Sequence, residues 1–424
     1  MMNIPVTGKK RIVVVGCGFA GLTIGKKLRN SVFQVVIIDK HNYHQFPPLF
    51  YQVASAGLEA SSILFPIRKI FQNYDDYHIR KAEVIGIEST ENKLLTTAGT
   101  VEYDYLILAH GATNSFFGSA EMKDCTRAMK TIAEVLDLRN SLLMNFENAL
   151  LAPTEEERER LLNIVIIGGG PSGVEIAGAL AEMNRYVLPK DYPEFKKIKI
   201  KIFLIEAADR LLNAMSPKSS EKAKKFLEKY GVKVMTKTMA QGCNAETVFL
   251  SSGESINTSM IIWTAGIKGN AIEGLDPEIY KKNHRIIVDD YCRVKGSENI
   301  YAIGDISIMT TGKYPSGHPQ VAQVAIQQAA FLAQHLKSLE NKRSFMPFRY
   351  KDKGTMATVG RHLAVVELPF MSFHGIFGWF VWMSVHLMSI IGVKNKLAIF
   401  ISWVWNYFTY DQSTRLILRP KGYS

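Results

Sequence analysis

The sequence has few cysteines, and none of them lie close together. Its 424 residues include only four, Cys17, Cys125, Cys243 and Cys292, and no CxxC pair occurs. Local disulfide frameworks, zinc ribbons and dithiol redox centres need closely spaced cysteines, so the spacing excludes them. We therefore expect reduced thiols and a cytosolic environment.

A long hydrophobic run is also missing from the N-terminus. The uninterrupted apolar run Ile12 to Val15 has only four residues, which is too short for the apolar core of a signal peptide. We expect no export. Recognisable nucleic-acid modules are absent too, and the basic residues behind the formal charge of +12 are spread along the chain. This charge favours anionic partners such as phosphates or a membrane surface, and we expect no nucleic acid.

The chain does have enough length and apolar content for more than one core. With 424 residues, 47% of them hydrophobic, it exceeds the usual size of a single domain. We expect two or three domains.

The first informative motif is a glycine-rich loop at the end of a strand. Residues 12–25 read IVVVGCGFAGLTIG, in which a valine-rich strand leads to Gly16, Gly18 and Gly21 and then to a helix. In this spacing the glycines permit a tight turn, a close approach of pyrophosphate and close packing of helix on strand. A second strand, FQVVIID, ends eighteen residues beyond Gly21 in Asp39, which can accept hydrogen bonds from a ribose. This unit predicts an adenine dinucleotide site.

The same arrangement occurs a second time. Strand 163–167 leads to Gly168, Gly170 and Gly173, a helix follows to about residue 183, and the strand IKIFLIE ends in Glu206. The stretch RYVLPKDYPEFKK between that helix and strand is interpreted as an insertion. A carboxylate here accepts from a 2′-hydroxyl and repels a 2′-phosphate, so Glu206 favours NADH, whereas the nearby Arg210 would suit NADPH.

A chain that holds two dinucleotides is suited to pass a hydride from a nicotinamide to a flavin. Two later segments favour FAD at the first site: the strand 102–112, which ends in small residues, and the short strand 299–307, which contains Gly304 and Asp305. With these features the chain resembles the flavoproteins that have two dinucleotide-binding domains, in which such a Gly-Asp pair binds the ribitol and pyrophosphate of FAD.

The resemblance implies an α/β fold with two interleaved Rossmann-like domains and a C-terminal membrane-anchoring helical region. The FAD domain is expected at residues 1–120 and 287–345, the NADH domain at 121–286 and the C-terminal region at 346–424. Within the NADH domain, residues 131–163 predict two helices with a break at Pro153 and Thr154, and residues 263–267 (WTAGI) close the domain. Candidate ligands of non-covalent FAD are Gly16, Gly18, Gly21, Asp39, Ala109, Gly111, Gly304, Asp305 and Gln320, and those of NADH are Gly168, Gly170, Gly173, Glu206 and Gly266.

Two glutamines offer a site for the electron acceptor. The stretch HPQVAQVAIQQAAFLAQHL begins at His318 and predicts a helix whose N-terminus would stabilise negative charge on a reduced flavin. Gln323 and Gln327 are four residues apart and share one face of it. Their neutral amides suit quinone carbonyls, which need donors but no fixed charge; the alternative is a solvent-facing pair.

Several motifs are similar to those of one family. AQVAIQ at 322–327 matches the AQxAxQ motif of type II NADH dehydrogenases, the NADH:quinone oxidoreductases that do not pump protons. DKHNYHQFPPLFYQVASAGL from Asp39, LAHGATNSFFG from Leu108 and GVEIAGALAEM from Gly173 resemble the same family. The resemblance implies that Glu175 lies near the nicotinamide and quinone pockets and binds quinone or delivers protons; on residue type alone, it equally suits the first turn of a helix.

The C-terminal region lacks charge over a long stretch. No Asp, Glu, Lys or Arg occurs from Leu368 to Val393. Four of the five tryptophans of the chain lie in the C-terminal region 346–424. Its length would allow a transmembrane helix, but glycines, a proline and mid-run tryptophan argue against one. We expect two amphipathic helices, with a basic hinge at Lys394 and Lys396, lying in the headgroup layer on the cytoplasmic face of the inner or cytoplasmic membrane. A buried core helix or a homodimer interface is the alternative.

The sequence therefore predicts an FAD enzyme of a respiratory chain that oxidises NADH and reduces a membrane quinone, without pumping protons. Two alternatives stay open. A sulfide:quinone oxidoreductase would need reactive cysteines beside the flavin, and Cys125 is the only one expected there. A flavin-bearing redox sensor would bind NADH without passing electrons to quinone.

Overall fold

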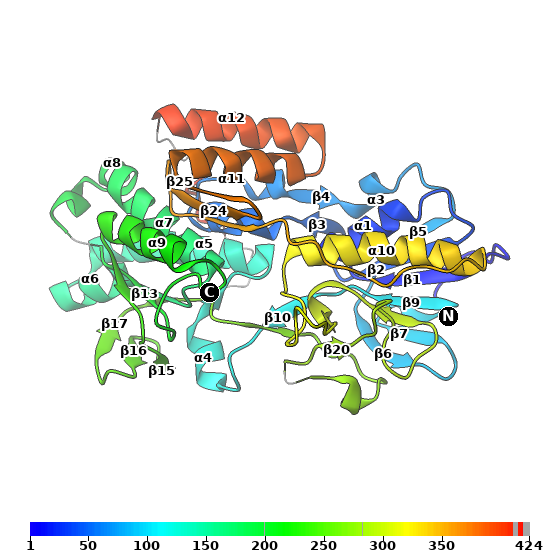
Figure 1. The fold of residues 1–424 in the computed structure, drawn as a ribbon. Coiled ribbons are helices and arrows are strands. Elements are labelled where there is room, and N and C mark those ends of the chain that lie inside the picture. The colour runs from blue at the N-terminus through cyan, green and yellow to red at the C-terminus, as the bar shows by residue number, and fades with distance from the viewer. Residues whose placement is uncertain (199, 282, 410–413, 419–424) are drawn as a thin grey trace. The chain divides into compact units, whose positions relative to one another are not determined.

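The computed structural model describes residues 1–198, 200–281, 283–409 and 414–418 (Figure 1). They form two compact units. Unit 1 comprises residues 1–44, 65–114 and 267–352, and unit 2 comprises residues 45–64, 115–266 and 353–424. The parts of the predicted tail at 410–413 and 419–424 lie outside the described residues.

Unit 1 is built on a five-stranded parallel sheet in the order β21-β9-β1-β2-β5. The strands are β1 (Arg11–Val15), β2 (Gln34–Asp39), β5 (Tyr77–Lys81), β9 (Tyr105–Leu108) and β21 (Ile300–Ala302). Their central residues are fully buried, which explains the unbroken runs of Val and Ile in β1 and β2. Helices α1 (Phe19–Lys27) and α10 (Ala322–Glu340) pack against each other in this unit.

Smaller elements complete unit 1. An antiparallel sheet contains β6 (Val84–Glu88), β7 (Lys93–Thr96) and β8 (Gly99–Glu102). Strand β10 (Ala112–Asn114) pairs with β19 (Ile267–Gly269), and β20 (Ile286–Ile287) pairs with β22 (Ser307–Ile308). The short helix α3 spans Ile67–Ile70.

Unit 2 repeats the same sheet in the order β11-β18-β12-β13-β14, again all parallel. The strands are β11 (Arg127–Ala128), β12 (Ile164–Ile167), β13 (Ile202–Ile205), β14 (Val232–Met235) and β18 (Met260–Trp263). In both units the strand before the glycine loop is central, and the strand before the predicted ribose-binding acid is its neighbour. Both Rossmann-like sheets are thus as predicted.

The helices of unit 2 include the pair predicted around Pro153, which the structure confirms as α5 (Ile132–Leu151) and α6 (Glu155–Leu162). A capping box formed by Thr131 and Glu134 begins α5. The remaining elements are α2 (Phe50–Ala54), α4 (Ala120–Cys125), α7 (Pro171–Tyr186), α8 (Leu188–Asp191), α9 (Pro217–Lys229) and an antiparallel sheet of β15 (Ala240–Cys243), β16 (Thr247–Leu250) and β17 (Ser255–Asn257).

The C-terminal part of unit 2 differs from the prediction. It begins with an antiparallel sheet of β23 (Thr355–Thr358), β24 (Ala364–Leu368) and β25 (Met371–Gly375), followed by α11 (Ile376–Ser389) and α12 (Val393–Thr409). Two helices were expected and are present, side by side in Figure 1. However, the uncharged run from Leu368 includes β25, and Lys394 and Lys396 lie in the first turn of α12 and not in a hinge.

The compact units divide the chain differently from the predicted boundaries at 120, 287 and 346. Residues 45–64 belong to unit 2 because α2 packs on α5 and α7. Residues 267–286 belong to unit 1, where β19 pairs with β10. The C-terminal residues from 353 belong to unit 2, since β23 packs on α7 and β24 on α9.

The expectation of four reduced thiols was wrong. Cys125 and Cys243 form a disulfide within unit 2, whereas Cys17 and Cys292 are free and buried. The bonded cysteines are 118 residues apart in the sequence. Because only the fold brings them together, their spacing gave no signal.

Candidate functional site

The first glycine loop has the geometry of a dinucleotide-binding turn. Gly16 has a φ of +90°, and a Cβ there would lie 2.7 Å from His110 Cα at the end of the neighbouring strand. A Cβ on Gly21 would lie 1.8 Å from Gly16 O, so only glycine allows α1 to pack this closely. Gly18, by contrast, faces open space and begins α1 with no side-chain cap. The backbone N–H groups of this helix end are therefore available to an anion.

Asp39 lies at the end of β2 and is oriented by two backbone donors. Cys17 N–H donates to Oδ2 at 2.6 Å, and His41 N–H donates to Oδ1 at 2.7 Å. Burial raises the pKa of Asp39, while both hydrogen bonds favour its charged form. The carboxylate thus faces the loop and keeps lone pairs that can accept from a ribose diol.

A buried histidine beside this loop has an unpaired nitrogen. His44 Nδ1 lies 2.8 Å from Cys17 O, and burial lowers the pKa of His44, so the neutral ring donates from Nδ1. Its Nε2 is buried and has no hydrogen-bond partner among the described residues. An unpaired acceptor next to an uncapped helix end fits a polar cofactor. His44 was not among the predicted site residues, although it lies in the stretch quoted for the family resemblance.

The predicted Gly304-Asp305 turn is held by two glutamines. Gly304 has a φ of +75° and its N–H donates to Gln328 Oε1 at 2.8 Å. Gln320 Nε2 donates to Asp305 O at 2.8 Å. Gln328 is buried and also accepts from the Ser307 hydroxyl, yet the sequence reasoning missed it, since the motif directed attention to Gln323 and Gln327.

All predicted FAD ligands lie in unit 1. Ala109 is buried directly after β9, and Gly111 has a φ of +73° with open space where a Cβ would point. Together with the loop, Asp39 and the Gly304 turn, they lie at or beyond the carboxyl ends of β1, β2, β9 and β21. Ligands bind at this end of parallel sheets. The residues present fit FAD.

The second loop in unit 2 reproduces the first. Gly168 has a φ of +111°, and a Cβ on it would lie 2.7 Å from Ala265 Cα. A Cβ on Gly173 would lie 1.8 Å from Gly168 O, whereas Gly170, which begins α7 without a side-chain cap, faces open space. This loop presents the same free helix N-terminus to a pyrophosphate.

Glu206 is oriented in the same way as Asp39. Gly169 N–H donates to Oε2 at 2.6 Å, and Ala208 N–H donates to Oε1 at 2.7 Å. Arg210 points to Asn213, with hydrogen bonds of 3.3 Å to its side chain and 3.1 Å to its carbonyl. Arg210 is thus directed towards Asn213, and the preference of Glu206 for a 2′-hydroxyl over a 2′-phosphate stays a prediction.

Residues 115–117 contact Trp263 at the end of β18 and Gly266 just beyond it. Ser115 N–H donates to Gly266 O at 3.0 Å, and Trp263 Nε1–H donates to Ser115 O at 3.0 Å. The Phe117 ring covers Gly266, where a Cβ would lie 2.9 Å from Phe117 Cζ. The predicted NADH contact at Gly266 therefore depends on the position of this segment.

Glu175 lies on α7, one turn beyond the second loop, and is 8% exposed. Burial raises its pKa to about 8, opposed by the Thr358 backbone N–H and the Trp382 indole N–H. The indole N–H contributes electrostatically without reaching full hydrogen-bond geometry. The carboxyl is mostly protonated at neutral pH and can give up a proton near pH 8.

A cavity of about 100 Å³ lies beside Glu175 in unit 2. Thr358 and Trp382 line it and also contact the Glu175 carboxyl. On α2, Gln52 Nε2 donates to Tyr51 Oη at 2.9 Å and Gln52 Oε1 accepts from Trp403 Nε1–H on α12 at 2.8 Å. The wall of the cavity is therefore aromatic with a few fixed polar groups, which is the usual lining of pockets that bind small molecules.

Gln323 and Gln327 lie in unit 1 on the N-terminal half of α10. Gln327 forms two hydrogen bonds with the Lys351 backbone, accepting at 3.0 Å and donating at 2.9 Å. Gln323 Nε2 donates to Asp352 Oδ1 at 3.5 Å. The helix face predicted from their spacing exists, and in this structure it holds residues 351–352.

Comparisons with known proteins identify the family. The pyridine nucleotide-disulphide oxidoreductase model matches residues 10–329, and the NDH2 C-terminal domain model matches residues 353–410. The type II NADH:quinone oxidoreductase NdhA of Mycobacterium tuberculosis is 32% identical over 94% of this chain and 87% of its own length. The chain belongs to the type II NADH:quinone oxidoreductases. The predicted family is confirmed, and with it an enzyme that uses FAD.

Solved structures show the same fold for this enzyme. NDH2 from Plasmodium falciparum in complex with NADH aligns with a TM-score of 0.87 at 20% identity, covering 97% of this chain and 100% of that one. The sulfide:quinone oxidoreductase from Aquifex aeolicus aligns with a TM-score of 0.71 at 17% identity, covering 97% and 96%. The sulfide alternative is not favoured, because the chain belongs to the other family and Cys125 is bonded to Cys243 in unit 2.

Proposed function

We propose that unit 1 holds FAD non-covalently at Gly18, Asp39 and the Gly304 turn, and that unit 2 holds NADH at Gly170, Glu206 and Gly266. The enzyme oxidises NADH and reduces a quinone without pumping protons, as its family membership indicates. FAD supplies the redox chemistry, since a flavin accepts a hydride and releases two electrons. The protein binds and orients FAD, NADH and the quinone, and it supplies protons to the quinone.

Selection of NADH is assigned to Glu206. Its two oxygens are fixed by Gly169 and Ala208 N–H groups, so the carboxylate cannot turn away from an incoming 2′-phosphate. Arg210 is held by Asn213 and does not offset that charge. A 2′-hydroxyl can donate to the carboxylate, whereas a 2′-phosphate would be repelled.

Proton delivery to the quinone is assigned to Glu175, and its burial is the observation that carries this assignment. Reduction of a quinone to a quinol consumes two protons as well as two electrons. A carboxyl whose pKa is raised to about 8 holds a proton at neutral pH and releases it to a stronger base. The adjoining aromatic cavity, lined by Tyr51, Trp382 and Trp403, gives an apolar molecule access to this side of α7.

Gln323 and Gln327 of α10 are proposed as hydrogen-bond donors to the quinone carbonyls, in contrast to Glu175, which is proposed as a proton donor. Gln327 donates to the Lys351 carbonyl at 2.9 Å, so a quinone carbonyl at this position would have to compete with that acceptor. Gln323 Nε2 donates to Asp352 Oδ1 at 3.5 Å. Both side-chain amides carry the N–H donor that a quinone oxygen requires.

The membrane face is assigned to α11 and α12. No helix among the described residues is long and apolar enough to cross a membrane. The two helices carry many exposed apolar side chains: Ile376, Phe377, Phe380, Val385, Met388, Val393, Leu397, Phe400, Ile401, Val404, Trp405 and Phe408. Such a surface, with Lys394 and Lys396 nearby, suits a monotopic enzyme lying in the headgroup layer, on the cytoplasmic face where NADH is available.

Anaerobic stopped-flow absorbance tests the proposed function. NADH should bleach the flavin band rapidly, and faster than NADPH does, and a short-chain quinone added in a second mix should restore it. Bleaching without recovery would contradict the quinone assignment and favour a redox sensor. Absence of bleaching would contradict the NADH assignment of unit 2.

A further inference from the structure

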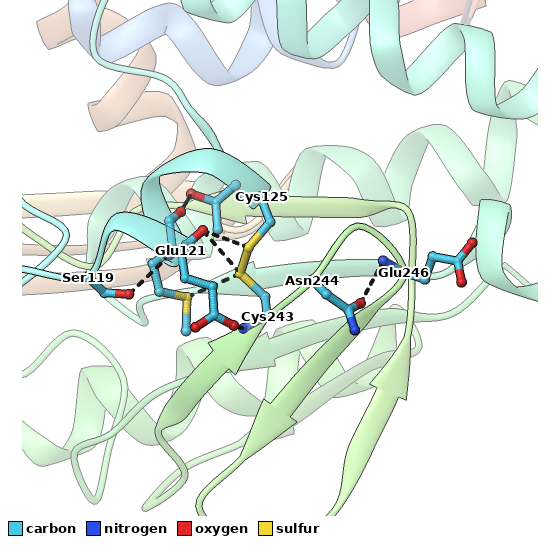
Figure 2. The surroundings of a disulfide bond; sticks show 8 residues. Ser119, Glu121, Cys125, Cys243, Asn244 and Glu246 are labelled. Carbon is cyan, nitrogen blue, oxygen red and sulfur yellow. Dashed lines mark hydrogen bonds between the residues drawn. A yellow bond between two sulfur atoms is a disulfide. The ribbon is translucent and has the colours of Figure 1, made fainter.

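The disulfide of unit 2 joins two elements that are far apart in the sequence. Cys125 is the last residue of α4 and Cys243 is the last residue of β15, and their Cα atoms lie 6.4 Å apart (Figure 2). This separation falls within the range that a disulfide spans without moving the backbone. The bond therefore connects the helical segment after Ser115 to the β15-β16-β17 sheet.

The two sulfur atoms have different surroundings. Cys243 is buried in a hydrophobic cluster that includes Met122, Phe203 and Trp263, whereas Cys125 is only partly buried. A thiolate from outside can therefore attack Cys125 Sγ, with Cys243 as the leaving group. Access to the attacked sulfur is one of the factors that set the rate of thiol-disulfide exchange.

Contacts other than the disulfide also link α4 to β15. The Glu121 carboxylate accepts from Cys243 N–H at 2.9 Å, and Met122 of α4 is buried in the same cluster. Ser119 caps α4 by accepting from Met122 N–H at 3.1 Å. In addition, Glu121 O lies 2.9 Å from Cys125 Sγ and 3.8 Å from Cys243 Sγ, so the dithiol form has an acceptor for its S–H groups. The bond can thus open and close again without unfolding.

The same segment reaches the proposed NADH site at its other end. Ser115 bonds to Gly266 O and accepts from Trp263, and the rings of Phe116 and Trp263 lie 5.3 Å apart. Phe117 covers Gly266. Only about ten residues separate these contacts from Cys125. A tether at Cys125 therefore restricts where residues 115–117 can move.

We propose that Cys125 and Cys243 form a reversible thiol-disulfide site that a dithiol reductant opens, and that the closed form holds residues 115–117 for tight NADH binding. A reductant thiolate bonds to Cys125 Sγ and breaks the Cys125–Cys243 bond, releasing the Cys243 thiolate. The second reductant thiol then attacks the mixed disulfide and releases the Cys125 thiolate. Two electrons and two protons pass from the reductant to the protein, and the reductant becomes a disulfide.

The inference rests on the assignment of Gly266 to the NADH site. Pre-organisation of a binding loop improves affinity by removing the cost of ordering it. We expect the reduced enzyme to show a KM for NADH about 3- to 10-fold higher, with kcat at saturating NADH unchanged, because neither cysteine belongs to the proposed proton-delivery or quinone contacts.

The experiment uses the full chain with bound FAD, equilibrated with mixtures of reduced and oxidised dithiothreitol and then desalted. Maleimide labelling after denaturation, read by intact mass, counts free thiols, and steady-state assays with a short-chain quinone give the KM for NADH. We expect two labels, on Cys17 and Cys292, in the low-KM form and four labels in the high-KM form. The Cys125→Ser variant should show the high KM and no response to dithiothreitol.

Three results would overturn the inference: four free thiols under oxidising conditions, an equal KM for the two-label and four-label forms, or a Cys125→Ser variant that still responds to dithiothreitol. The first two come from the unaltered chain, so they hold even where the variant fails to fold. Loss of NADH-dependent quinone reduction in both redox states would instead contradict the proposed function.

Discussion

Three carboxylates in this enzyme have similar chemistry but different surroundings. Asp39 and Glu206 each receive two backbone N–H donors, which orient them beside a glycine loop. Glu175 is buried against aromatic rings and receives fewer donors, so burial dominates and raises its pKa to about 8. The first two are suited to bind a ribose, and the third is suited to hold a proton.

Replacing Glu175 with Gln should lower quinone reduction about 100-fold or more, because a positioned proton donor typically contributes about 10²- to 10⁴-fold. Wild-type reoxidation by quinone should slow as pH rises through about 8, where the carboxyl loses its proton. Stopped-flow reoxidation measured from pH 6 to 9 gives both quantities. The Gln variant should show no such pH dependence, while flavin reduction by NADH stays at the wild-type rate.

The same substitution should change how stability depends on pH. The folded-state pKa of Glu175, about 8, lies above its ordinary value of 4.5, so the folded chain binds this proton more tightly than the unfolded chain does. Stability contributed by the protonated carboxyl is present below pH 4.5 and is lost as pH rises towards 8. The Tm of Glu175→Gln should therefore rise relative to the wild-type Tm as pH increases from 5 to 8. A difference in Tm that is the same at every pH would argue against a buried protonated carboxyl.

Replacing Glu206 with Gln should relax the choice of nucleotide. Loss of the negative charge removes repulsion of a 2′-phosphate, so kcat/KM for NADPH should rise about tenfold relative to that for NADH, equal to about 1.4 kcal/mol. Steady-state kinetics with both nucleotides measure the ratio. Asp209→Asn removes an exposed charge three residues away and is the matched control; an equal effect there would mean that only net charge matters.

At the scale of elements, one arginine contributes two of the hydrogen bonds that attach α12 to the rest of unit 2. Arg361 donates to the backbone carbonyls of Asn406 and Tyr407 near the C-terminal end of α12, where unpaired carbonyls favour a cation. Its Nε also forms an ion pair of 3.2 Å with Glu182 on α7, and both side chains are largely buried. The pair therefore connects the helix after the NADH loop with the helix proposed to meet lipid.

Removing only the arginine should be more damaging than removing both charges. Arg361→Gln leaves Glu182 buried without its charged partner, which costs about 3–5 kcal/mol, whereas the double variant Arg361→Gln with Glu182→Gln leaves neither of these buried charges. Hydrogen exchange across residues 393–409 should be fastest in the single variant, and thermal unfolding should follow the same order. A double variant less stable than Arg361→Gln would contradict this account.

Predictability also differed between elements. The glycine loops, their strands and the α5 and α6 pair could be predicted, because each depends on local chemistry such as a φ that favours glycine or a capping box. The sheet β23-β24-β25 could not, since its strands are stabilised by packing on α7 and α9 and its hydrophobic run resembled a helix. His44, Gln328 and the Cys125–Cys243 pair were missed for a related reason: each functions through a partner that only the fold brings near.

At the scale of the whole molecule, the exposed apolar side chains of α11 and α12 form a surface of the kind that marks a membrane or protein interface. Phe377 and Phe408 are 73% and 76% exposed, and insertion of each ring into lipid would contribute about 1.5–3 kcal/mol. Membrane binding and self-association are the two ways to cover such a face. The basic net charge of +12 favours an anionic bilayer.

The double variant Phe377→Ser with Phe408→Ser should bind vesicles of anionic phospholipid about tenfold or more weakly than wild type in a flotation assay. Phe249→Ser, which removes a ring that is 44% exposed on β16, is the matched control and should float like wild type. If flotation is unaffected while sedimentation shows a dimer becoming a monomer, the face is an interface between copies of the chain.

Helix α7 has a consequence for how this enzyme can change over time. Gly170 is the N-cap residue of the helix, and Glu175 and Glu182 follow five and then seven residues later. At about 1.5 Å per residue, the helix therefore fixes a distance of roughly 18 Å between the nucleotide loop and the Glu182–Arg361 ion pair. Inserting one residue would rotate everything beyond it by about 100° and turn Glu175 or Glu182 away from its pocket. Loops of this enzyme can change in length, but α7 is free to change only in sequence.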